Sequence, residues 1–72
     1  MDADYEKLWM ILKDRKLKKK DLLEMSGISS NIMAKMSKGE LISMDSVKKI
    51  CIALGCDVGD IVVVNENAEK IN

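Results

Sequence analysis

The sequence predicts an all-α fold of five short helices and allows one short β-strand near its carboxyl end. Apolar residues recur at helical spacing in successive segments, the four glycines stand singly between or at the ends of these segments, and proline is absent. With 72 residues, of which 47% are hydrophobic, the chain is long enough for one small core and one domain. Its two aromatic side chains are Tyr5 and Trp9, so aliphatic residues and methionine must fill that core.

The first predicted helix begins after Asp4, whose carboxylate is a suitable N-cap. It ends near Arg15 or Lys16, where basic side chains suit the carbonyl end of a helix. Its apolar stripe has the spacing i, i+3, i+4, i+7 and consists of Tyr5, Leu8, Trp9 and Leu12.

The second predicted helix runs from about Lys19 to Met25 and stops at Gly27, which can adopt the left-handed conformation that closes a helix. Ser29 is a good N-cap for a third helix through about Ser37. The side chains predicted to face inward are Met33 and Met36, and those predicted to face outward are Ser30, Asn31, Ala34 and Lys35.

The fourth predicted helix is capped by Ser43 or Ser46 and closed by Gly55. A fifth, short helix starts at Asp57 and ends at Ile61, and the β-branched run 62–64 favours a strand. We therefore expect a domain over residues 1–64, followed by a polar, frayed tail over residues 65–72.

Positive charge is concentrated in one part of a chain whose formal net charge is zero. Residues 13–38 contain eight basic and three acidic side chains, a net charge of +5, whereas the segments before and after carry −2 and −3. A dipolar molecule with one positive region suits a nucleic-acid partner, although a charge run is also compatible with a plain solvated face.

Several function classes find little support in the composition. The chain has no histidine, the usual general base near neutral pH, and no glycine-rich phosphate loop, so we expect neither an enzyme nor a cofactor. Asp57 and Asp60 are explained by the start of a short helix. Cys51 and Cys56 lack the spacing of a metal site or of a same-face disulfide, and we expect two buried free thiols. The acidic amino terminus and the lack of a long apolar run favour a cytoplasmic protein with no membrane span.

The segment from Leu17 to Ile61 resembles the Cro/cI-repressor (Xre-type) helix-turn-helix domain of small bacterial transcriptional regulators. The motifs that carry the resemblance are DLLEMSGIS, MAKMSKG and VKKICIALGCDVGDI, together with the Tyr5, Leu8 and Trp9 start. The resemblance implies a five-helix lambda-repressor-like fold. It also implies that the second and third helices form the DNA-binding unit.

Carried over position by position, the resemblance implies a set of DNA-contacting residues. Those expected to touch bases are Ser30, Asn31 and Lys35, since Asn pairs with adenine and Lys with guanine. For Ser30 an ordinary solvated position is an equally open interpretation. Those expected at phosphates or groove edges are Lys18, Lys19, Lys20, Ser29, Lys38 and Ser43. Lys18 and Lys19 stand where the family usually has Thr-Gln, which weakens the cap of the second helix.

The leading hypothesis is a sequence-specific DNA-binding transcriptional regulator, most simply a repressor, acting as a homodimer on a double-stranded operator. The alternative is a protein-interaction module on the same fold that does not bind DNA, such as an anti-repressor. Residues 61–64 could pair edge to edge with a second copy, or could pack on the first helix and complete the core; both interpretations stay open. No small-molecule ligand is expected.

Overall fold

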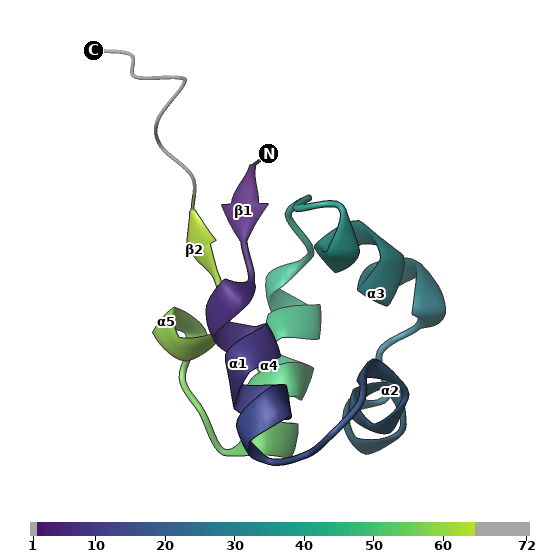
Figure 1. The fold of residues 1–72 in the computed structure, drawn as a ribbon. Helices are drawn as coiled ribbons and strands as arrows, with labels where there is room; N and C mark the ends of the chain where they lie inside the picture. Colours follow the sequence, from purple (N-terminus) through teal and green to yellow (C-terminus); the bar gives the residue numbers. More distant parts are fainter. Residues whose placement is uncertain (1, 65–72) are drawn as a thin grey trace, which may run out of the picture.

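The computed structural model describes residues 2–64 and contains five helices and two short strands (Figure 1). The elements in chain order are β1 (Ala3–Asp4), α1 (Glu6–Asp14), α2 (Lys19–Ser26), α3 (Ser30–Ser37), α4 (Met44–Leu54), α5 (Val58–Ile61) and β2 (Val63–Val64). The predicted five-helix fold is thereby confirmed. The predicted frayed tail, residues 65–72, lies outside the described residues.

The core lies where α1, α2, α4 and α5 pack together. The side chains with essentially no exposed surface are Leu8, Leu22, Met36, Ile50 and Ile61, one from each helix. Of the predicted α1 stripe, Trp9 alone is only half-buried, at the edge of the core. Because these side chains come from every helix, the core fixes the positions of α2 and α3 relative to the rest of the chain.

The start of α1 differs from the prediction by one residue. The N-cap is Tyr5, and Asp4 lies in β1. The Asp4 carboxylate still serves the helix, because its Oδ1 accepts a hydrogen bond from the Glu6 backbone N–H at 2.8 Å. The side chain of Tyr5 is buried instead, and burial raises the pKa of its hydroxyl, an effect that a backbone hydrogen bond with Ile42 partly offsets.

The two ends of the domain meet in a small antiparallel sheet that the sequence predicted only in part. Ala3 is opposite Val64 and Asp4 is opposite Val63. On its other side, β1 is bonded to the turn after α3, where the Gly39 carbonyl accepts from the N–H groups of Asp2 (3.0 Å) and Ala3 (2.9 Å). Of the run 61–64, Ile61 completes the core, while Val63 and Val64 are exposed on β2.

The carboxyl end of α4 is closed by a left-handed Gly55, after which the chain turns back on the helix. The N–H groups of Gly55 and Cys56 both donate to the Cys51 carbonyl, the pattern of a Schellman-type cap. Arg15, just after α1, donates from Nη1 to the Leu54 carbonyl at 2.8 Å and ties the ends of α1 and α4 together.

The cysteines occupy this cap. Both are free thiols, as predicted, but they are half-buried and not fully buried, because the cap lies at the surface. Burial, followed by the nearby Cys56 and by Asp57 and Asp60, raises the pKa of the Cys51 thiol and so favours its protonated form.

Candidate nucleic-acid interface

The N-terminal end of α2 presents three consecutive exposed lysines, Lys18, Lys19 and Lys20. Lys18 is the N-cap by position, but its side chain makes no capping bond, as the Thr-to-Lys departure predicted. The backbone N–H of Lys18 donates instead to Oδ2 of Asp21 at 2.8 Å, so the acidic side chain fixes the first turn. The Lys18 ammonium group thus takes no part in capping α2.

A tight turn joins α2 to α3. Gly27 has φ +81°, in the left-handed region, and its N–H donates to the Leu23 carbonyl. Ile28 is buried directly after it and anchors the turn to the core. The Ser29 Oγ then accepts the N–H of Ile32 at 3.2 Å and caps α3, as predicted.

Helix α3 buries one side and exposes the other. Met33 and Met36 are buried, Ile32 is half-buried, and the exposed side chains include the predicted Ser30, Asn31, Ala34 and Lys35. Figure 1 shows α2 and α3 next to each other on the side of the molecule opposite α5. The exposed face of α3 is therefore a short, polar and mildly basic ridge on an outer element of the fold. We call it the reading face.

Lys19 links the start of α2 to the end of α3. Its Nζ donates to Oγ of Ser37 at 3.1 Å and stands 4.5 Å from the centroid of the Trp9 ring. Ser37 follows Ser30 and Ala34 at i+7 and i+3, so it continues the stripe of the reading face. Three helices thus meet at one ammonium group.

Of these three side chains, sequence reasoning found Lys19 and missed the roles of Trp9 and Ser37. The sequence predicts Trp9 as part of the core stripe and of the motif that carries the resemblance, and Ser37 only as the end of its helix. The only sequence features that bear on this contact are the basic start of α2 and the single tryptophan on α1, and their spacing does not show that they meet.

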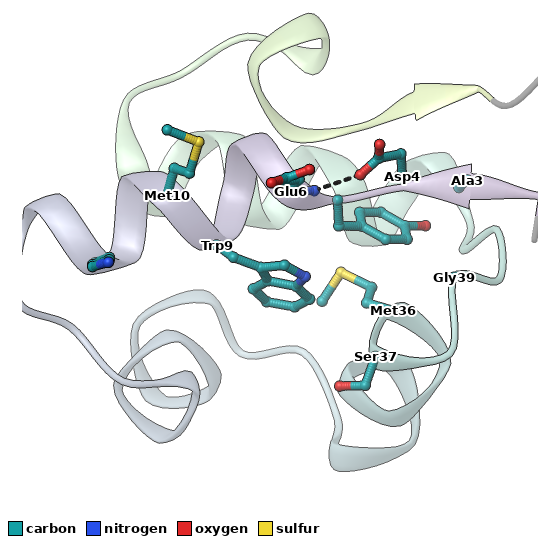
Figure 2. A pocket seen from close by; sticks show the side chains of 10 residues that line it. Ala3, Asp4, Glu6, Trp9, Met10, Met36, Ser37 and Gly39 are labelled. Carbon is teal, nitrogen blue, oxygen red and sulfur yellow. Dashed lines mark hydrogen bonds between the residues drawn. The ribbon is translucent and has the colours of Figure 1, made fainter.

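Figure 2 shows the surroundings of Trp9, which lies between α1 and the last turn of α3, with Met36 and Ser37 facing it. Two recesses share its ring. The first, of about 440 Å³, includes Asp4, Glu6, Lys13 and Ser37 in its lining, and we call it the acidic recess. The second, of about 300 Å³, is lined by Trp9, Leu12, Lys13, Leu17 and Lys19, and we call it the lysine recess.

The remaining predicted contacts lie around the turn from α3 to α4. Lys38 is the exposed C-cap of α3, and Ser43 is the N-cap of α4. The choice between Ser43 and Ser46 is settled, because the Ser43 Oγ accepts from the Ser46 N–H at 3.2 Å. Ser46 itself is buried, so Ser43 is the exposed one of the two serines.

The described residues offer neither a membrane span nor a metal site. No helix within residues 2–64 is long and apolar enough to cross a membrane. The same part of the chain holds no cluster of three or more histidine, cysteine, aspartate or glutamate side chains able to bind a metal ion.

Two short helices joined by a glycine turn, the second with one buried and one polar face, define a helix-turn-helix unit. A model of the Cro/C1-type HTH DNA-binding domain matches residues 7–67. Since this match spans most of the chain, the chain belongs to the Cro/C1-type helix-turn-helix family.

A solved structure supports the same assignment. The chain is similar to a crystal structure of the transcriptional regulator VanUg, with a TM-score of 0.84 and 41% sequence identity, over 89% of this chain and 85% of that one. Among curated proteins, none matches this sequence. The resemblance drawn from the motifs and the helical fold drawn from the periodicity are both confirmed.

Proposed function

We propose that this protein is a sequence-specific DNA-binding transcriptional regulator, acting as a repressor, and that residues 1–64 form its DNA-binding domain. The observation that carries the proposal is the reading face of α3, a polar ridge held by buried Met33 and Met36 and capped by Ser29. The family of the chain and its likeness to a transcriptional regulator support the same function.

In this proposal α3 enters the major groove and reads base edges. Asn31 has an amide that matches N6 and N7 of adenine, and Lys35 has an ammonium group for O6 or N7 of guanine. Both side chains are exposed on the described surface. Ser30 adds a short hydroxyl that fits close to the bases. With no arginine on this face, part of the sequence preference comes from DNA shape.

Phosphate contacts would position the domain along the duplex. The residues assigned to them are Lys18, Lys19, Lys20, Ser29, Lys38 and Ser43. They lie at the start of α2, at the start of α3 and on either side of the turn into α4, and so surround the reading face. Such contacts give affinity without sequence information, and the affinity falls as salt rises because counterions are released.

A reading face on one eight-residue helix contacts few base pairs, so the proposal includes a homodimer on two half-sites. Half-sites on one side of the duplex lie about 34 Å apart. We assign the subunit contact to the outer edge of β2, where Val63 and Val64 are 42% and 66% exposed. Strand pairing across such an edge would extend the two-stranded sheet of each subunit.

The test is a double charge reversal, Lys19→Glu with Lys35→Glu. We expect this variant to lose its binding to duplexes that the wild-type protein selects from random DNA. The reason is that two negatively charged side chains would then face the negatively charged phosphates. The melting temperature should fall only slightly, since the exposed Lys19–Trp9 contact is worth about 0.5–1 kcal/mol. Electrophoretic mobility shifts and thermal unfolding measure the two quantities.

The matched control for this test is Lys7→Glu with Lys49→Glu, which changes the net charge equally. Lys7 points to α5, where Nζ is 3.5 Å from the Gly59 carbonyl, and Lys49 pairs with Asp45 along α4. The control should keep most of the affinity. Equal retention by the two double variants would contradict the assigned surface.

A second function, a protein-interaction module such as an anti-repressor, is favoured by zero net charge and by a reading face without arginine or glutamine. It predicts no duplex binding at any salt concentration. A mobility-shift series with rising salt distinguishes the two, since DNA binding must appear at low salt and fade steeply.

A further inference from the structure

The lysine recess is a surface feature of which the proposed contacts use only Lys19. Its walls are the ring of Trp9 and the aliphatic side chains of Leu12 and Leu17, and its cations are Lys13 and Lys19. None of the five lining residues is acidic. The acidic recess shares Trp9 and Lys13 with it but also contains Asp4 and Glu6, so an anion beside Trp9 is better accommodated in the lysine recess, where Lys19 adds a second cation.

The recess continues the reading face. Lys19, at its rim, is bonded to Ser37, the last residue on the exposed stripe of α3. A path therefore runs over the surface from Ser30 and Ala34 to Ser37, then to Lys19 and on to Lys13. A duplex strand that left the reading face at the end of α3 in this direction would meet these two lysines next.

The composition of the recess matches one unit of a nucleic-acid backbone. A backbone phosphate carries one negative charge and two non-bridging oxygens, each of which can accept a hydrogen bond from one of the two ammonium groups. The apolar wall suits the face of a deoxyribose. In the free protein, Lys19 is held 4.5 Å from the Trp9 ring centroid by the attraction between a cation and an aromatic face. A full negative charge attracts the Lys19 ammonium group more strongly than the Trp9 ring does. A bound phosphate can therefore draw this ammonium group away from the ring.

We propose that the lysine recess seats a backbone phosphate of the bound duplex, with Lys13 of α1 as an additional DNA-contacting residue and Trp9 as its wall. The inference rests on the proposed DNA-binding function and extends the interface from α2 and α3 to α1. The charge of the recess and its continuity with the reading face specify a backbone phosphate as the bound group. This contact would not depend on base sequence.

The experiment compares Lys13→Gln with Lys7→Gln, the same change on the same helix. Lys7 is exposed but faces α5, so both variants lose one charge and only one of them changes the recess. Affinity for a random-sequence duplex is measured over rising salt. We expect Lys13→Gln to weaken binding about tenfold and to reduce the slope of log K against log salt by about 0.9, the contribution of one phosphate. Lys7→Gln should leave the slope unchanged.

A second measurement uses Trp9 itself, the one tryptophan in the chain. Its fluorescence should change on adding DNA to wild type or Lys7→Gln, because Lys19 leaves the ring. The phosphate seat is wrong if the two variants have equal salt slopes and equal affinities, or if Trp9 fluorescence does not change when DNA is added. Either result leaves the proposed function standing. A wild type that binds no duplex at low salt would overturn the proposed function and the seat with it.

Discussion

Gly27 is the residue on which the geometry of the helix-turn-helix unit depends most directly. With φ +81° it lies in a region that L-residues with a Cβ adopt at a cost, and no heavy atom lies within 4 Å of where its Cβ would be. The requirement for glycine is thus a matter of backbone conformation and not of space. Lys16, with φ +58°, tolerates the same region between α1 and α2 without being a glycine.

Gly27→Ala should therefore lower the free energy of unfolding by about 1 kcal/mol, the cost of a left-handed Cβ residue. The matched control is Gly59→Ala, which also meets open space but lies in α5 without a positive φ. There alanine should stabilise the domain by about 0.4–1 kcal/mol, through a less flexible unfolded chain. Urea unfolding of the two variants checks the prediction. It would be contradicted if both substitutions changed the free energy of unfolding in the same direction.

At the level of elements, the relation between α1 and α4 depends on a side chain outside both helices. Arg15 follows α1, and its guanidinium satisfies the Leu54 carbonyl at the end of α4, where a helix leaves carbonyls unpaired. The Cys56 thiol is the other nearby group, with its Sγ 3.9 Å from Nη2. One exposed side chain thus holds the lower ends of two core helices.

Arg15→Ala should lower the free energy of unfolding by about 1 kcal/mol, less than a buried charged hydrogen bond because the side chain is exposed. The comparison is Lys48→Ala on the exposed side of α4, which should change stability by less than about 0.5 kcal/mol. Denaturant midpoints provide the measurement. Indistinguishable midpoints for the two variants would mean that the Leu54 contact adds nothing.

The helices could be predicted from the sequence because each carries its own signals. Ser29 and Ser43 cap α3 and α4, and Gly27 and Gly55 end α2 and α4. The apolar stripes identify the buried faces. Strand β1 could not be predicted, because Ala3 and Asp4 have no strand preference and their partners Val64 and Val63 are some 60 positions away.

The candidate site divides in the same way. The reading face follows from periodicity within α3, so Asn31 and Lys35 were found on the exposed side. The contact of Lys19 with Trp9 and Ser37 joins three helices, and the lysine recess needs Lys13 and Leu17 as well. Such groupings depend on the angles at which the helices pack. A local sequence pattern does not predict these angles.

For the whole molecule, the outer edge of β2 is the place where a second copy would add most simply. Val63→Lys should shift a monomer–dimer equilibrium toward monomer, because a charge would stand on the paired edge. Val58 on α5 is equally exposed, at 42%, and Val58→Lys is the matched control that should leave the equilibrium alone. Sedimentation at several concentrations measures both, and a Val63→Lys protein that dimerises like wild type rejects the strand interface.

The bonds around β1 have a mechanical consequence. This strand is held on one side by β2 and on the other by the Gly39 carbonyl, while the Tyr5 hydroxyl donates to the Glu40 carbonyl at 2.7 Å. Both ends of the domain are thereby anchored to the turn that terminates α3. A force applied at either end of the domain would therefore act on α3, the helix that we assign to the DNA groove. A fused tag or a second subunit paired with β2 would apply such a force.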